Sequence, residues 1–446
     1  MQTVKRSTRI LILTSNLGHG HTRAAQALRA TLLACEPDAE VPIVDWWSLM
    51  NPAVAQLAQR LYLDLVQNHP ELYERVYHLG ERTWRDMLTH HAAPAAMLEL
   101  FDALAAMSAR ESLNTLTGPH GSDAVLWAAF NAGGVRTKLA VMKWAWARLS
   151  RRMHSLLDTM APDVVVSTQM IPAALVAKAK QHHATLIPSI AVPTDFGVHD
   201  FWIQPGTDLY CLAHESVVGQ PDSQRSPLEV TKTRITGLPL MPDFMPPPLV
   251  TAARRELRLP TSEPIVLILG GGLGLGVDSI AEYLLRAEVP GRLLVLVARN
   301  AVARTRLLEL EKVWPQRIQV HDWTERVAVF LRAADVIVGK PGGLSVAESL
   351  ACGRPFFAVR SLRGQEGFNV RFLERHQVGG LLSEQELVVE LRRLLTHPEE
   401  LRALQARAWA VGERMAAVKI AATVLEYVDD SRVEVEWQPD RHGAGS

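Results

Sequence analysis

Hydrophobic residues in this chain form short uninterrupted runs that alternate with longer amphipathic segments. The first run, Ile-Leu-Ile-Leu within residues 9–14, precedes a polar loop and then a helical pattern over residues 22–34. An uninterrupted apolar strand is typical of a parallel sheet whose two faces are both covered by helices. Further strands are predicted at residues 41–45, 163–167 and 186–192, and a helix at residues 171–181. The N-terminal half is therefore predicted to be an α/β domain.

A second α/β series follows residues 238–249, where five prolines predict a connection between domains. Its strands are predicted at residues 265–269, 293–297, 318–320, 336–338 and 356–359, and its intervening helices at 278–286, 303–314, 327–333 and 345–351. This alternation is the rhythm of βαβ units in a parallel sheet. Helices at residues 384–395 and 398–428 are expected to close the fold.

The pattern divides the chain into two domains. Residues 1–240 form the first, interrupted by a helical insertion at about 51–160 with breaks near His90, Pro119 and Gly133. Residues 241–429 form the second, and residues 430–446 are predicted to be a disordered tail.

Composition narrows the class of protein. The 446 residues are 48% hydrophobic with a formal net charge of +0, which argues against a protein that binds nucleic acid by neutralising its phosphates. Cys35, Cys211 and Cys352 are too widely spaced for a disulfide or metal pattern, which favours the reducing cytoplasm. No apolar stretch reaches the roughly 20 residues that a spanning helix needs, and the apolar run behind the basic start is too short for a signal peptide. Any membrane contact is expected to be peripheral.

The most informative segment is residues 338–348, Val-Gly-Lys-Pro-Gly-Gly-Leu-Ser-Val-Ala-Glu. Gly342 and Gly343 let the backbone approach a diphosphate, and the N-terminus of the following helix offers free N–H groups and the positive end of a dipole. Glu348 lies far enough into that helix to bind ribose hydroxyls. The segment predicts a site for a nucleotide or sugar nucleotide; the alternative is a strand-to-helix turn that serves only packing.

Three other glycine-containing loops follow predicted strands, where open α/β sheets bind their ligands. In the first, residues 15–21, His21 or His19 can accept a proton near neutral pH, or the pair can simply cap and pack the helix start. The second, residues 270–276, lacks both the dinucleotide-binding and the P-loop spacing and suits close approach to a phosphate or a neighbouring domain. The third, residues 363–369, offers amide, carboxylate and guanidinium groups that suit sugar hydroxyls, or is an ordinary polar loop.

Together these segments resemble the monogalactosyldiacylglycerol synthases and processive diacylglycerol glucosyltransferases of glycosyltransferase family 28. The resemblance covers residues 9–36, 162–215 and 235 to about 380. It is carried by Gly18-His19-Gly20-His21, Val192-Pro193-Thr194-Asp195-Phe196, Trp202-Ile203, Thr236-Gly237-Leu238-Pro239, Arg299-Asn300, Lys340 to Glu348, and Gly364-Gln365-Glu366 with Asn369.

The resemblance implies a GT-B fold, in which two Rossmann-like domains face each other across a cleft and a C-terminal helix crosses back. It implies inverting transfer of a hexose from a UDP-sugar to a lipid hydroxyl, with diacylglycerol the expected acceptor. His21 would be the general base and Asp195 would organise the acceptor side, together with Gly18, Gly20 and Thr194. Donor-side roles fall to Gly272, Arg299, Lys340, Gly342, Gly343, Glu348, Gln365, Glu366 and Asn369. No cofactor and no obligate metal are implied, and the sequence contains no Asp-x-Asp.

An enzyme that acts on a lipid hydroxyl is expected to bind the inner face of an anionic membrane. The insertion offers basic residues interleaved with tryptophans, although tryptophans at helical spacing often belong to a core. These residues are Lys138, Lys143, Arg148, Arg151, Arg152, Trp127, Trp144 and Trp146. Other functions remain open: N-acetylglucosamine transfer to a polyprenyl-linked precursor, UDP-sugar 2-epimerisation, or non-catalytic binding of a nucleotide sugar.

Overall fold

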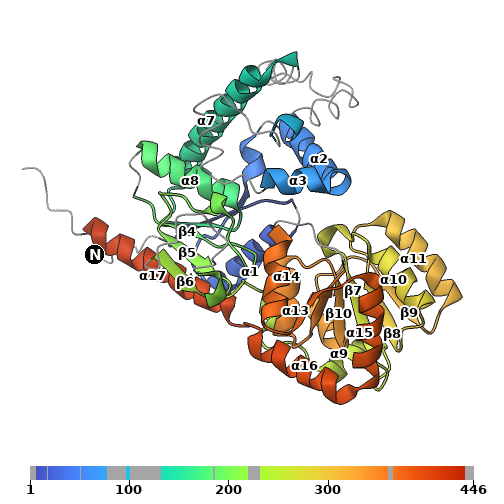
Figure 1. Ribbon diagram of the computed structural model, residues 1–446. Coiled ribbons are helices and arrows are strands. Elements are labelled where there is room, and N and C mark those ends of the chain that lie inside the picture. Colours follow the sequence, from blue (N-terminus) through green and yellow to red (C-terminus); the bar gives the residue numbers. More distant parts are fainter. Residues whose placement is uncertain are drawn as a thin grey trace, which may run out of the picture.

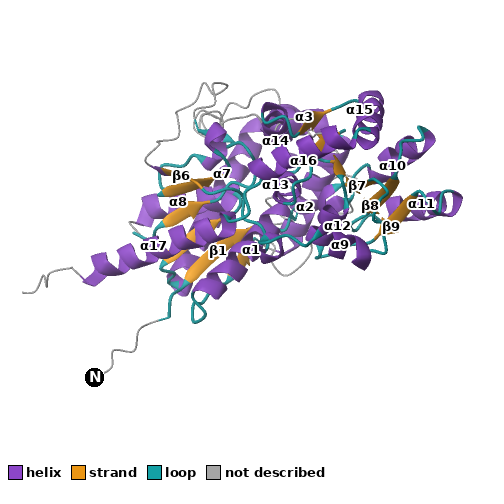
Figure 2. Cartoon of the chain, turned by 90° about the horizontal axis from the view of Figure 1, so that it is seen from below, coloured by secondary structure: helices purple, strands orange, loops and turns teal. Residues whose placement is uncertain are grey.

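A computed structural model describes residues 7–17, 19–50, 52–77, 97–100, 132–183, 186–218, 232–359 and 365–436. In this part of the chain the strands form two parallel sheets of six strands each, in the order β2-β1-β3-β4-β5-β6 and β12-β11-β10-β7-β8-β9. Figure 1 shows the sheets in two separate bodies, and Figure 2 shows their strands between layers of helices. The predicted α/β, two-domain GT-B fold is confirmed.

The first sheet contains β1 Ile10–Thr14, β2 Ile43–Asp45, β3 Val164–Ser167, β4 Ser189–Ala191, β5 Leu209–Leu212 and β6 Thr233–Ile235. Its helices are α1 Gly20–Cys35, α2 Pro52–Asn68, α3 Pro70–Tyr77, α7 Val135–Met160 and α8 Met170–His183. Short 3₁₀ turns lie at Trp46–Leu49, Asp200–Trp202 and Glu215–Val217.

The second sheet contains β7 Ile265–Leu269, β8 Arg292–Leu296, β9 Ile318–His321, β10 Val336–Gly339, β11 Phe356–Ala358 and β12 Gly379–Leu381. Its helices are α9 Val250–Glu256, α10 Val277–Arg286, α11 Ala301–Val313, α12 Val327–Ala333, α13 Gly343–Ala351, α14 Gln365–Arg375, α15 Glu384–Thr396 and α16 Pro398–Val411. The 3₁₀ turns η6 Pro242–Phe244 and η7 Gly271–Leu273 precede α9 and α10.

The side chains of β1 explain why its apolar run is uninterrupted. Ile10 and Ile12 pack with α1 and α17 (Ala416–Glu436) on one face of the sheet, whereas Leu11 and Leu13 pack with α7 and α8 on the other. All four are at most 1% exposed, and burial of such a side chain contributes about 1.5–3 kcal/mol. Helix α17 thus returns from the second domain to the first, as Figure 1 shows.

Several elements differ from the sequence-based expectations. Strands β5, β6 and β12 were not predicted, and residues 365–369, expected in a loop, form the first turns of α14. The helical segment predicted at 398–428 is two helices, α16 and α17. Helix α17 continues to Glu436, past residue 430 where a disordered tail was predicted to begin; residues 437–446 lie outside the described part. In the described parts of 51–160 every regular element is a helix.

Candidate active site

The order of the strands places two of the predicted segments at the point where the strand order of each sheet reverses. In each sheet the order reverses next to the first strand, between β1 and β3 and between β7 and β10. Open α/β sheets bind ligands at the carboxyl ends of strands at such a reversal. The His21 segment follows β1, and the Lys340 segment follows β10. The two segments therefore lie where their sheets can present a ligand site.

The ring of His21 is held by backbone and hydroxyl groups. Its Nδ1 lies 2.8 Å from the carbonyl oxygen of Thr168, which can only accept, so Nδ1 carries the proton. The Thr194 hydroxyl lies 3.0 Å from the same nitrogen. Burial lowers the pKa of His21 to about 4, against the opposing effect of the Thr168 hydrogen bond. The neutral ring therefore presents an unprotonated Nε2, the form that a general base requires.

Asn369 joins the acceptor segment to the donor segment. Its amide nitrogen donates to Asp195 Oδ1 at 2.8 Å and to the Pro341 carbonyl at 3.0 Å. Its amide oxygen accepts from the Phe196 N–H at 2.8 Å. Asn369 is 0% exposed, so these bonds form in the interior of the domain interface. The Phe196 ring stacks on Phe372 of α14, with centroids 3.9 Å apart, and extends this contact.

Gly343 allows the two segments to touch. A Cβ atom at this position would lie 2.0 Å from the Thr194 carbonyl oxygen and 2.8 Å from Asp195 Oδ1. Only a residue without a side chain fits there. Gly342, the N-cap residue of α13, has open space around its Cβ position apart from Ser345 Oγ at 3.9 Å. The two glycines of the motif therefore differ in what they permit.

Lys340 and Glu366 form an ion pair within the second domain, with Nζ and Oε1 2.5 Å apart. Burial lowers the pKa of Lys340, but Glu366 outweighs it, and Tyr62 and Asp195 also favour the charged form, so the pKa is raised. Tyr62 belongs to α2, which places that helix of the insertion near the donor segment. Gln365 is the first residue of α14.

Glu348 is buried in the second turn of α13, with 6% of its surface exposed. Burial raises its pKa to about 7, although the nearby Arg23 lowers it. The Arg23 Nε lies 3.3 Å from Glu348 Oε1, and the two residues come from different domains. This partner was not predicted.

A second contact between the domains surrounds His19. A Cβ atom at Gly272 would lie 2.6 Å from His19 Nδ1, and the His19 ring lies 5.1 Å from that of Trp323. The Arg299 guanidinium lies over the Trp323 ring, 4.8 Å from its centroid. His19 thus faces the second domain, whereas His21 faces Thr168 and Thr194.

The helices that begin at this interface lack side-chain caps. His19 precedes α1, and its side chain makes no capping hydrogen bond. Gly342 precedes α13 and has no side chain that could cap the helix. By contrast, Ser383 and Glu386 form a full capping box at the start of α15. Uncapped N–H groups at a helix N-terminus are suited to an anion.

The remaining predicted residues have mixed outcomes. Gly20 begins α1, and Gly18 lies outside the described residues. On α7, Lys143 and Arg151 are exposed, Trp144 is 36% exposed, and Arg148 lies over its ring at 5.2 Å.

Part of the proposed membrane patch is not on the surface. Lys138 is buried, Trp146 packs edge-on against Phe201, and Arg152 donates to the Leu49 carbonyl. Trp127 lies outside the described residues. The exposed part of this patch is therefore smaller than the sequence indicates.

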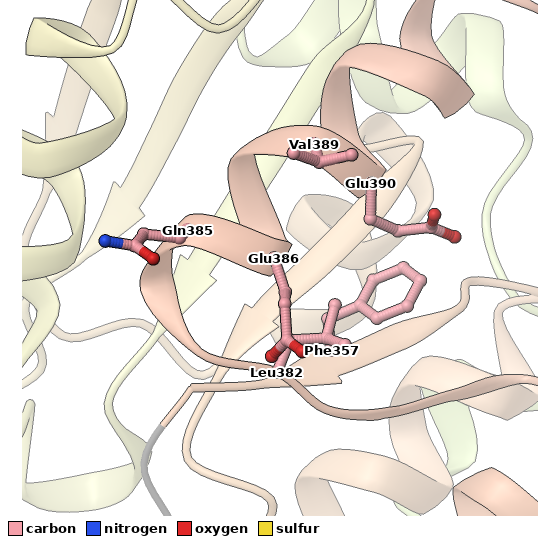
Figure 3. A pocket seen from close by; sticks show the side chains of 6 residues that line it. All are labelled: Phe357, Leu382, Gln385, Glu386, Val389 and Glu390. Carbon is pink, nitrogen blue, oxygen red and sulfur yellow. The ribbon is translucent and has the colours of Figure 1, made fainter.

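A hollow of about 530 Å³ lies elsewhere, between β11 and α15 (Figure 3). It is lined by Phe357, Leu382, Gln385, Glu386, Val389 and Glu390. None of the predicted site residues lines it, and Glu386 is occupied by the α15 capping box.

The residues that the structure describes contain no group of three His, Cys, Asp or Glu side chains arranged to hold a metal ion. No helix among them combines the length and the apolar character needed to cross a bilayer.

Three residues of the interface were not predicted from the sequence. Arg23, Thr168 and Trp323 contact predicted residues, yet none stands in a glycine-rich segment. The available signal was positional for Trp323 and Thr168, because each closely follows a strand. Arg23 carried no such signal.

The chain is similar to known proteins in sequence and in fold. Residues 128–240 match the family model described as monogalactosyldiacylglycerol (MGDG) synthase. The chain is 22% identical over 428 residues to the processive diacylglycerol β-glucosyltransferase of Bacillus pumilus (strain SAFR-032), covering 94% of this chain and 95% of the relative.

Among solved structures, MurG of Acinetobacter baumannii superposes with a TM-score of 0.56 at 14% identity, over 94% of this chain and 99% of MurG. A UDP-glucose: anthocyanidin 3-O-glucosyltransferase in complex with UDP gives 0.53 at 12% identity, over 96% and 100% of the two chains. The UDP-GlcNAc 2-epimerase of Neisseria meningitidis gives 0.52 at 12% identity, over 94% and 100%.

The fold is the GT-B fold of glycosyltransferases, as the sequence predicts. More particularly, the chain is similar over nearly its whole length to processive diacylglycerol β-glucosyltransferases, so the resemblance seen in the sequence is confirmed.

Proposed function

We propose that this protein is an inverting glycosyltransferase that moves a hexose from a UDP-sugar to the hydroxyl of a diacylglycerol-like lipid. The observation that carries the proposal is the fixed tautomer of His21 beside the Thr194-Asp195 segment, which Asn369 joins to the donor segment. The lipid and the sugar class are taken from the similar proteins, which are a diacylglycerol β-glucosyltransferase and the monogalactosyldiacylglycerol synthase family.

These positions support the following reaction. The acceptor hydroxyl gives its proton to Nε2 of His21 as its oxygen attacks the anomeric carbon from the face opposite the leaving group. The bond from that carbon to the diphosphate oxygen breaks, and UDP leaves with the electron pair. The uncapped N-terminus of α13 meets the charge that develops on the diphosphate.

Further roles are proposed for the donor side. Glu348 binds the ribose, and Gln365 and Glu366 bind sugar hydroxyls. Arg299 and Gly272 are also assigned to the donor side, and no metal ion is required. We also propose cytoplasmic residence with peripheral binding to an anionic membrane, in which Trp144, Lys143 and Arg151 of α7 take part.

The test is incubation of the purified protein in chelator with UDP-glucose or UDP-galactose, and with diacylglycerol in neutral or anionic vesicles. Mass spectrometry should detect a hexosyl lipid, formed faster with anionic vesicles and more slowly as salt is added. Donor consumed without glycolipid would point to hydrolysis, epimerisation or another acceptor. Loss of transfer in chelator would contradict the metal-free reaction.

The His21→Ala variant tests the base. Transfer should fall by about 10²- to 10⁴-fold because the acceptor loses its proton acceptor, while UDP-glucose affinity is retained. His397→Ala, at the junction of α15 and α16, is the control and should keep full activity. Turnover by His21→Ala at the wild-type rate would exclude His21 as the base.

A further inference from the structure

Arg23 is a charged residue of the first domain whose side chain is fixed on the second. It lies in the first turn of α1, and its side chain is 17% exposed. Its Nε reaches Glu348 Oε1 at 3.3 Å, and its Nη2 donates to the Glu325 carbonyl at 3.0 Å. A guanidinium held at two points, one of them a buried carboxylate, is not an ordinary solvated surface charge.

The charges around Glu348 make Arg23 its supporting cation. Asp243 of η6 and Cys352 at the end of α13 also face this carboxyl group. The negative charge of Asp243 disfavours ionisation of Glu348. The positive charges of Arg23 and Arg326 favour the ionised form of Asp243. Those of Arg332 and Arg354 favour the ionised form of the Cys352 thiol. Among these groups in the described residues, Arg23 is the cation that contacts the Glu348 carboxylate.

We propose that Arg23 is a positioning residue for the donor: it holds Glu348 as an oriented carboxylate, with one oxygen on the guanidinium and the other turned to the ribose hydroxyls of a UDP-sugar. This inference rests on the proposed function of Glu348. It adds that a residue of the acceptor domain completes the donor site, so that the donor binds well only when the domains are together.

Chemistry explains why the ionised form matters. A carboxylate can accept hydrogen bonds from both ribose hydroxyls, whereas a protonated carboxyl group uses one oxygen as a donor. Burial raises the pKa of Glu348 to about 7 even with Arg23 in place. Removal of Arg23 raises that pKa further, so more of the protein is protonated at neutral pH and donor affinity falls. Affinity recovers as the pH increases.

The experiment is calorimetric titration of UDP-glucose into the full chain between pH 6.5 and 8.5. The phosphates of UDP-glucose do not titrate in this range, so the pH dependence reports the protein. At pH 7, R23Q should bind roughly tenfold more weakly than wild type, and the difference should narrow towards pH 8.5. R23K, which keeps the charge, should recover most of the affinity and the wild-type pH profile.

Two controls make the result specific. In an E348Q background, R23Q should produce no further loss, because Arg23 acts through the carboxylate. R393Q removes a different arginine ion pair, between α15 and α16, and should leave binding unchanged. If R23Q does not fold, R23M keeps the packing of the stem and takes its place.

Three results would overturn the inference. They are an R23Q affinity and pH profile equal to those of wild type, a full R23Q effect in the E348Q background, and an R23K profile that matches R23Q. Failure of the proposed function is distinguished from these results by two wild-type measurements: a protein that is not a donor-binding enzyme would not bind UDP-glucose at any pH, and one that binds the donor without transferring it would form no glycolipid.

Discussion

At Glu348 the needs of binding and of stability oppose each other. The folded protein raises the pKa of this group from its ordinary 4.5 to about 7, so the folded state holds the proton more tightly than the unfolded state. The contribution of Glu348 to the free energy of unfolding is therefore fully present below the unfolded pKa and is lost as the pH rises through the folded pKa. The difference is about 3 kcal/mol at 1.36 kcal/mol per pKa unit. The protein keeps a carboxyl group that destabilises it at neutral pH.

Glu348→Gln should accordingly increase the free energy of unfolding at pH 8, by roughly 1–3 kcal/mol, and change it little at pH 5. It should also weaken the binding of UDP-glucose, because an amide offers one acceptor oxygen to the ribose hydroxyls where a carboxylate offers two. Chemical denaturation at both pH values checks the first statement, with the exposed Glu309→Gln as the control. A Glu348→Gln variant that is less stable than wild type at pH 8 would show that the charged Glu348 carboxylate does not destabilise the folded protein.

Single residues also mark the limit of sequence interpretation. His21 and Asn369 could be named because they stand in short, distinctive segments, but the Thr168 carbonyl that fixes the His21 tautomer is a backbone atom 147 positions away. Arg23 has the appearance of an ordinary charge on an amphipathic helix. Its contact with Glu348 forms only because the two domains pack together, and no local sequence pattern predicts how the domains pack.

At the scale of elements, α13 illustrates how a helix start can be shaped by its neighbour. Its first residue, Gly343, is packed against the Thr194 carbonyl, although alanine would favour the helix itself. The preceding Gly342 has open space. Close approach between α13 and the loop after β4 thus outweighs helix propensity at one position.

Gly343→Ala should lower the free energy of unfolding by about 1–3 kcal/mol, because the new methyl group forces the two segments apart. Gly342→Ala is the matched variant and should change stability by less than about 0.5 kcal/mol. Thermal and denaturant unfolding of the two variants provides the comparison. Equal stability of the two variants would mean that α13 and the Thr194 segment can move apart at little cost in free energy.

The elements that sequence reasoning found and missed differ in length and burial. β1 and β7 are five-residue strands buried on both faces and apolar except for Thr14, and both were predicted. β12 is Gly-Gly-Leu at a sheet edge and β6 is Thr-Arg-Ile, so neither carries a strand signal of its own; pairing with β11 and β5 creates them. The polar residues of α14 suggested a loop, whereas its polarity serves the interface.

At the scale of the whole molecule, Asn369 is the hydrogen-bonded centre of the contact between the two sheets. It satisfies Asp195, the Pro341 carbonyl and the Phe196 N–H at once, with no exposure to water. Helix α17 supplies a second connection by packing on α1. Specific hydrogen bonds at Asn369 and the packing of α17 thus both contribute to the position of one domain on the other.

Asn369→Ala should lower the free energy of unfolding by about 2–3 kcal/mol, because buried groups lose their partners. Asn369→Asp should be more damaging, despite its similar shape, because it places a second carboxylate beside Asp195 and removes the donor. Denaturant unfolding ranks the two. Equal stability of the aspartate and alanine variants would argue that Asp195 is not held by this amide.

The ion pair of Arg23 and Glu348 connects the two domains, and this has a thermodynamic consequence for binding of the donor and the acceptor. If donor affinity depends on the domains being together, any acceptor that favours the same arrangement must tighten donor binding, and the donor must tighten acceptor binding by an equal factor. A lipid already in the cleft would then recruit its sugar more effectively than an unloaded protein. Wasteful hydrolysis of donor would be suppressed by the same coupling, without a dedicated lid.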